Sequence, residues 1–154
     1  MKIDNLYSIH DGEKILKSNH LMWNEIQYVI NESNLTFYKG CSPEIKKEIS
    51  ISFDKLGWAD TVKIKPTNLS INFIKRKVGV CFQLGNVART YADLLKIQVF
   101  FQKELIDVGV LIVPVKNYSK KIGSNIAQFE RLREEIILFD QIITLPLVII
   151  GLST

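Results

Sequence analysis

The stretch Val78-Gly79-Val80-Cys81-Phe82-Gln83-Leu84-Gly85-Asn86 carries the strongest structural signal in this chain. It begins with an almost unbroken apolar run, and a second apolar run, residues 69–74, precedes it. The two-residue basic turn Arg76-Lys77 lies between the two runs. Apolar runs joined by so short a connection predict a β-hairpin with strands over residues 69–74 and 78–84.

Three side chains of this hairpin are expected to meet. Because residues two apart in a strand share one face, Cys81 and Gln83 point in the same direction. Asn72 lies nine residues before Cys81, at the polar end of the other strand, and hairpin pairing turns it toward them. Two amides and a thiol therefore form a candidate functional site on one face of the predicted sheet.

Length and composition indicate one globular domain over residues 1–154. A chain of 154 residues can bury roughly 70% of its unfolded surface. Apolar residues make up 47% and charged residues 23% of the chain, which are ordinary values for a globular protein. The net charge of +4 is compatible with a polyanionic partner but does not require one.

We expect a soluble, cytoplasmic protein with reduced thiols. Cys41 and Cys81 are the only cysteines, too few for a framework of disulfides. Residues 1–5 lack the apolar core of a signal peptide. The longest apolar run, residues 145–152, is far shorter than the roughly 20 residues of a membrane span.

The remaining pattern predicts helices on both sides of a sheet. Apolar residues at helical spacing, with capping and breaking residues, predict helices over residues 20–33, 42–56, 87–101 and 122–140. Alternating or continuous apolar runs predict strands over residues 61–65, 69–74, 78–84, 108–113 and 145–150. This order predicts the α/β class, as a three-layer α/β/α sandwich around a mixed sheet.

Several stretches, taken in order and with their spacing, resemble one family. They begin near Asn72 and continue through Phe82-Gln83-Leu84-Gly85-Asn86, Asp93-Leu94-Leu95-Lys96, Ile106-Asp107-Val108-Gly109-Val110, Ile112-Val113-Pro114-Val115-Lys116 and Pro146-Leu147-Val148-Ile149-Ile150-Gly151. Weaker matches are His10 to Gly12, Ser42-Pro43 and Gly57-Trp58. The ordered set resembles the BglII/BstYI branch of type II restriction endonucleases, within the PD-(D/E)XK nuclease superfamily. This resemblance implies the restriction-endonuclease fold.

The resemblance also implies a magnesium site, and this chain departs from it. The family pattern is Asp, eight residues, Glu, one residue, Gln, where this chain has Asn72, Cys81 and Gln83 at the same spacing. Mg²⁺ prefers charged oxygen ligands, whereas Asn72 offers a neutral carbonyl oxygen and Cys81 a soft sulfur. The resemblance thus marks these three as the catalytic positions, the first two as metal positions, and both carboxylates are missing.

Other polar residues could complete such a site. The family takes a polar residue from the helix before the hairpin, and Glu44, Lys47 and Glu48 are the candidates here. Asp93 lies one turn into the helix after the hairpin and is a further candidate, as a substitute for the carboxylate missing at Cys81. The alternative reading of Asp93 is a solvated or capping residue near a positive helix end.

A nuclease resemblance makes basic residues candidates for contacts with DNA phosphates. The candidates are six basic residues and one amide, which lie in the hairpin turn, in the helix after it and in a predicted loop: Lys75, Arg76, Lys77, Asn86, Arg89, Lys120 and Lys121. Lys63, Lys65 and Lys96 are weaker candidates. Each of these side chains has an ordinary alternative reading as a solvated surface residue.

Two functions remain open from the sequence. The first is a Mg²⁺-dependent endonuclease that acts as a homodimer on a short palindromic site in double-stranded DNA. The second is a catalytically inactive relative that binds DNA or a protein partner without cleavage. Binding of Mg²⁺ would discriminate between them, because both metal carboxylate positions are substituted.

Overall fold

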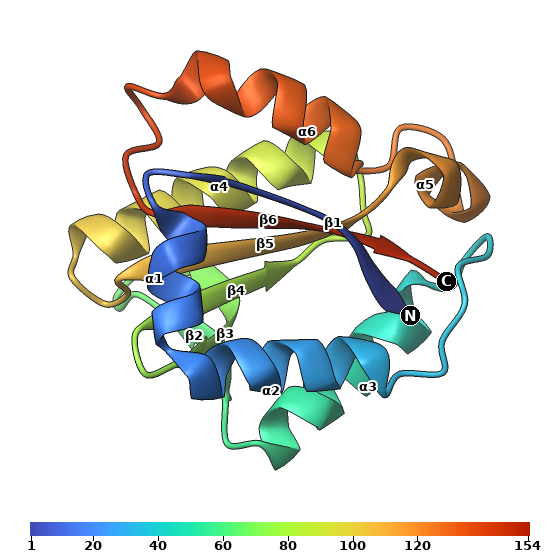
Figure 1. Ribbon diagram of the computed structural model, residues 1–154, viewed down its shortest axis with the longest axis horizontal. Helices are drawn as coiled ribbons and strands as arrows, with labels where there is room; N and C mark the ends of the chain where they lie inside the picture. Colours follow the sequence, from blue (N-terminus) through green and yellow to red (C-terminus); the bar gives the residue numbers. More distant parts are fainter.

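A computed structural model describes all 154 residues of the chain as one mixed sheet with helices on both faces (Figure 1). The strands are β1 (Lys2–Ile9), β2 (Ala59–Lys63), β3 (Ser70–Lys75), β4 (Val78–Phe82), β5 (Val108–Pro114) and β6 (Leu147–Ser153). The helices are α1 (Gly12–Ser18), α2 (His20–Asn31), α3 (Ser42–Lys55), α4 (Val87–Gln102), α5 (Lys116–Ile122), α6 (Phe129–Glu135) and the 3-10 helix η1 (Ile136–Phe139). The strand order is β1-β6-β5-β4-β3-β2.

The centre of the sheet is parallel and its margins are antiparallel. β4, β5 and β6 run parallel, and every residue of these three strands is buried. Continuous apolar sequence is typical of strands that are covered on both faces. β3 returns antiparallel beside β4 through the turn Arg76-Lys77, which confirms the predicted hairpin. β1 and β2 pair antiparallel at the two edges.

The sheet separates two apolar cores. Helices α1, α2 and α3 cover one face and helices α4 and α6 cover the other (Figure 1). Because side chains alternate along a strand, Val80 and Phe82 pack toward α2 and α3. Cys81 lies between them and packs toward α4. The predicted three-layer α/β/α sandwich is confirmed, and none of its helices is long and apolar enough to span a membrane.

The second half of the chain differs from its prediction in one region. The helix predicted over residues 122–140 is confirmed only from Phe129 to Phe139, as α6 and η1, and its first part is wrong, because α5 ends at Ile122 and α6 begins at Phe129. Between them the backbone forms hydrogen bonds with the start of α4, from Ala127 N–H to Gly85 O and from Val87 N–H to Asn125 O. These tertiary bonds compete with helix formation. The loop predicted around Lys120 and Lys121 belongs to α5.

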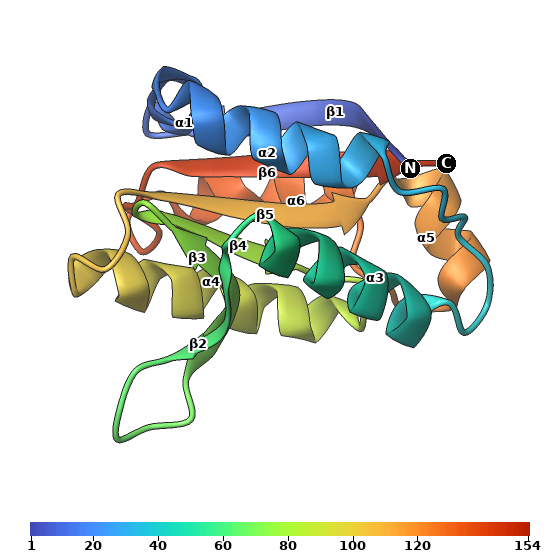
Figure 2. The ribbon, with the colours of Figure 1, turned by 90° about the horizontal axis from the view of Figure 1, so that it is seen from below.

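The first elements of the chain were not predicted. β1 is an edge strand with few buried residues, so its sequence lacks the apolar pattern that marks the central strands. The short helix α1 follows it and packs Leu16 into the core. β2 begins and ends two residues earlier than predicted, and its connection to β3 projects beyond the helices (Figure 2).

Gly109 of β5 offers a test of the packing between sheet and helices. A Cβ at this position would lie 2.4 Å from Ile97 Cγ2 and 2.7 Å from Leu145 Cδ1, so neighbouring side chains would have to move. We expect Gly109→Ala to lower the free energy of unfolding by about 1–3 kcal/mol, measured by urea denaturation. Gly123→Ala is the control, because its Cβ would meet nothing closer than 3.7 Å. Equal stability of the two variants would contradict this packing.

Candidate functional site

The three hairpin residues singled out in the sequence line one cavity. The cavity has a volume of about 300 Å³ and lies where β3 and β4 meet α3 and α4. Its lining contains Lys46, Thr61, Ser70, Ile71, Asn72, Cys81, Phe82, Gln83, Arg89, Ala92, Asp93 and Lys96. The expected convergence of Asn72, Cys81 and Gln83 is therefore present in the structure, and Asp93 lies with them.

Asn72 lies at the cavity, where the backbone pairing of β3 with β4 ends. The β3–β4 ladder pairs Phe73 with Val80 and goes no further toward Asn72. Beyond that pair, the side chain of Asn72 replaces the backbone partner, since its Oδ1 accepts a hydrogen bond from Phe82 N–H at 2.9 Å. This bond satisfies a strand end that would otherwise be unpaired. The bond also uses one of the two lone pairs of the Asn72 oxygen that a cation would need.

Gln83 joins the end of β4 to α4. Its Nε2 donates to Asp93 Oδ2 at 2.6 Å, and its Oε1 accepts from Gly85 N–H at 2.8 Å. A side chain at Gly85 would collide with that oxygen, because a Cβ there would lie 2.8 Å from Gln83 Oε1. Both ends of the Gln83 amide are therefore used within the protein.

Asp93 is the one carboxylate that lines the cavity, and its oxygens are also engaged. It is 7% exposed and accepts from Gln83 Nε2 and from Lys96 Nζ at 3.0 Å. The helix that carries it is capped by Asn86, whose Oδ1 accepts from Ala88 N–H at 2.8 Å. Asp93 is thus neither a cap nor a solvated residue, but a partnered anion beside Cys81.

Cys81 is held as a neutral thiol. Its side chain is fully buried among apolar residues of the α4 core. Burial raises the pKa of the Cys81 thiol far above its ordinary value, and the negative charge of Asp93 raises it further. A metal ligand or a nucleophile requires the thiolate. The environment of Cys81 therefore favours an inert packing role.

Three basic side chains line the cavity together with the residues just described. Lys46 comes from α3, whereas Arg89 and Lys96 come from α4. The pKa of Lys46 is lowered, first by burial and then by the positive charge of Arg89, while Asp93 opposes these effects. Three positive groups thus face one carboxylate that already has an ion pair. The cavity carries a net positive charge.

The sequence pointed to the wrong residues of α3. Glu44, Lys47 and Glu48 were the candidates, but none of them lines this cavity. Glu44 accepts a hydrogen bond from Tyr38, and Lys47 lies in an adjoining hollow beside β2. The residue that reaches the cavity is Lys46. Glu44 and Glu48 also adjoin the buried stripe Ile45, Ile49 and Phe53, so the sequence pattern held no signal that distinguishes Lys46 from them.

The residues present do not fit Mg²⁺. Asn72 and Gln83 offer neutral oxygens, Asp93 is the one carboxylate and is paired with Lys96, and the thiol of Cys81 is protonated. No three His, Cys, Asp or Glu side chains gather anywhere in the chain. Mg²⁺ needs charged oxygens to offset its loss of hydration water, and three nearby cations would repel it.

The basic hairpin turn lies elsewhere. Lys75 Nζ binds Glu25 at 2.8 and 2.9 Å, and Glu25 also accepts from Trp58 Nε1, so this lysine stabilises the α2 side of the sheet. Arg76 and Lys77 form the turn at the start of β4, whereas the cavity lies at its end. Five residues of strand place them about 16 Å away. This turn and the cavity therefore lie at opposite ends of β4.

The other basic candidates lie at the cavity edge of the sheet. Arg89 lines the cavity itself. Because β5 runs parallel to β4, the helix α5 begins at the same edge as Gln83. Lys120 is exposed on α5, and Lys121 Nζ lies 4.2 Å from the centre of the Tyr118 ring.

Comparisons with known proteins agree with this architecture. The crystal structure of restriction endonuclease BglII complexed with a DNA 16-mer superposes with a TM-score of 0.88 at 16% identity, covering 100% of this chain and 77% of that chain. Free BglII superposes with a TM-score of 0.75 at 17% identity, covering 100% and 80%. A search of curated proteins gives no match. The model of the family described as restriction endonuclease BglII/BglIII matches residues 5–152, and this chain therefore belongs to that family.

Proposed function

We propose that this restriction-endonuclease-like protein binds double-stranded DNA and does not cleave it through a magnesium site. The observation that carries the proposal is the charge of the cavity. Lys46, Arg89 and Lys96 face a single carboxylate at the place where the family holds its metal, and Asp93 is already paired. This is the second of the two functions considered from the sequence.

Support for DNA binding comes from the family and from the placement of charge. A BglII structure contains DNA, and the fold of that protein covers the whole of this chain. Arg89, Lys46 and Lys47 lie around the cavity, and Lys120 is exposed at the same edge of the sheet. Lysine and arginine side chains release counterions from DNA when they contact its phosphates. Such a protein would act in the cytoplasm, where Cys41 and Cys81 stay reduced.

The loss of cleavage follows from the missing charges. A metal ion in a nuclease activates water and neutralises the charge that develops on the phosphorus oxygens. Asn72 and Cys81 carry no negative charge with which to hold it. Removing one oriented electrostatic group lowers a rate by about 10²–10³. Losing the ion removes several such effects together.

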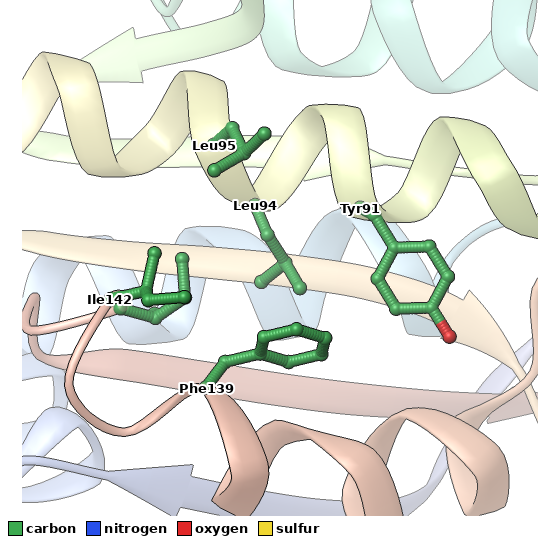
Figure 3. A pocket seen from close by; sticks show the side chains of 6 residues that line it. Tyr91, Leu94, Leu95, Phe139 and Ile142 are labelled. Carbon is green, nitrogen blue, oxygen red and sulfur yellow. The ribbon is translucent and has the colours of Figure 1, made fainter.

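We further propose that the protein is a homodimer, joined through an apolar surface on α4 and η1. Six residues line a hollow between these elements: Tyr91, Leu94, Leu95, Phe139, Ile142 and Ile143 (Figure 3). Around it Leu95, Leu138 and Ile142 are 54%, 81% and 56% exposed. Exposed apolar groups concentrated in this way are typical of protein–protein contacts.

A second copy of this chain is the partner that fits the surface. The exposed residues of α4 are Ala88, Arg89, Ala92, Leu95 and Gln102. Arg89 lines the cavity, so the side of α4 that faces away from the cavity carries no charge. Neighbouring α6 carries both signs, with exposed Arg131, Arg133 and Glu134. A two-fold axis places one surface against its own copy, so the apolar centre meets itself and the mixed charges can pair.

DNA binding is testable without metal. We expect a duplex to bind in EDTA as tightly as in Mg²⁺, measured by fluorescence anisotropy, and plasmid DNA to stay intact in Mg²⁺. Arg89→Ala should weaken binding to every duplex and lower the salt slope by about 1. Arg76→Ala is the matched control, because it removes the same charge at the far end of β4. Cleavage by the parent protein, or no binding at low salt, would contradict the proposal.

The substituted carboxylates give a second test. Calorimetric titration of the parent with millimolar Mg²⁺ should show no binding, whereas the double variant Asn72→Asp, Cys81→Glu should bind the ion. Each single variant should bind much less, because one carboxylate leaves the ion half-coordinated. Circular dichroism checks that the variants fold.

The control for this titration is the double variant Asn34→Asp, Asn68→Asp, which adds the same charge on exposed surface away from the cavity and from the proposed dimer contact. Stoichiometric binding of Mg²⁺ by the parent would show that other ligands replace the missing carboxylates. Equal binding by the two double variants would show that the cavity is not the site.

The proposed dimer surface can be tested by introducing a charged residue into it and measuring the oligomeric state. Leu138→Glu places a negative charge at the most exposed residue of the patch, so the dimer should dissociate to a monomer in light scattering with size-exclusion chromatography. Leu105→Glu is the control, because Leu105 is also exposed, at 44%, but follows the end of α4 and belongs neither to η1 nor to the hollow. A parent protein that is monomeric at all concentrations would overturn the proposal.

A further inference from the structure

We infer that the cavity is a metal-free phosphate site, in which Lys46, Arg89 and Lys96 hold a phosphate group directly. This inference rests on the proposed function, because the phosphate would be a phosphodiester of bound DNA. It adds a chemical role for the cavity, which would bind an anion where the family resemblance implies a cation.

The first argument is the placement of the three cations. Lys46 extends from α3, and Arg89 and Lys96 extend from α4, about two turns apart on that helix. Two different helices therefore contribute cations to one cavity, and the ends of β3 and β4 line it with Asn72 and Gln83. An anion in the cavity would be contacted from both helices.

The second argument is that two of these charges have no partner within the chain. Lys96 pairs with Asp93 at 3.0 Å, but neither Lys46 nor Arg89 forms an ion pair or a side-chain hydrogen bond. Lys46 is half-buried, and its pKa is lowered first by burial and then by repulsion from Arg89. A bound anion would relieve this repulsion and supply the missing acceptor oxygens.

The third argument concerns size and hydrogen-bond capacity. The cavity of about 300 Å³ is many times larger than the roughly 10–15 Å³ needed to hold one water, so a phosphate group fits with water around it. Arg89 can donate two parallel bonds to phosphate oxygens, and Lys46 has three donors on one atom. The partnered carboxylate of Asp93 is the one group that opposes an anion.

The experiment uses two probes, inorganic phosphate and duplex DNA, both in EDTA. The parent should bind phosphate in calorimetry, and Lys46→Ala should weaken that binding about tenfold, the loss expected for a hydrogen bond to a charged group. Lys46→Arg should restore most of it. Lys55→Ala is the matched control, because Lys55 is exposed at the far end of the same helix.

Addition of Mg²⁺ should leave the affinity of each probe unchanged. A phosphate held through a bridging metal would instead bind more tightly in its presence. For the DNA probe, Lys46→Ala should also lower the salt slope by about 1, and Lys55→Ala should leave it unchanged.

The outcomes separate the inference from the function on which it rests. If DNA binds and Lys46→Ala changes neither probe, the cavity is not a phosphate site and the proposed function stands. If phosphate binds through Lys46 but DNA does not, DNA binding is overturned and free phosphate is the ligand of the cavity. If Lys46→Ala weakens the binding of both probes and Lys55→Ala weakens neither, the assignment of the cavity to a phosphodiester of DNA is supported.

Discussion

The hydrogen bond between Gln83 Nε2 and Asp93 Oδ2 is the interaction on which the site depends. It joins the end of a central strand to the middle of α4, across the boundary between the sheet and a helix layer. Lys96 completes the arrangement from the same helix. A buried carboxylate without partners lowers the stability of a protein, so removing Gln83 or Lys96 would destabilise the structure around Asp93. The bond therefore holds Asp93 in place at the cavity, where its charge adds to the effect of burial in raising the pKa of the Cys81 thiol.

The same constraint explains how a nuclease fold can persist after its metal site is altered. Asn72 and Gln83 stand at catalytic positions of the family resemblance, and here their oxygens accept hydrogen bonds from backbone N–H groups of the hairpin and of the turn after β4. The bond of Asn72 needs only an acceptor oxygen, which an amide provides as well as a carboxylate, whereas Gln83 also donates to Asp93. A fold is maintained by packing and hydrogen bonding, whereas its chemistry depends on a few side chains, so the two can change independently.

The sequence predicted those features that depend on local pattern. The buried strands, the hairpin and the meeting of Asn72, Cys81 and Gln83 follow from apolar runs and from the two-residue period of a strand. Features that depend on distant contacts were missed. The edge strand β1 is stabilised by β6, and the break after Ile122 by bonds to the start of α4, and neither contact is visible in local sequence. Lys46 was overlooked because three charged neighbours on α3 offered equal chemistry, and only the orientation of the helix distinguishes them.

Helix α4 connects the two surfaces on which function is proposed. All three of its charged residues, Arg89, Asp93 and Lys96, line the cavity, so the outward side is left with alanine, leucine and amide side chains. This segregation follows from helical spacing, because residues three and four apart share a side. A partner that covers the outward side would bury no charge of α4 and would leave the cavity open to DNA. One helix can thus serve an apolar contact and an anion site at once, since each uses a side that the other does not need.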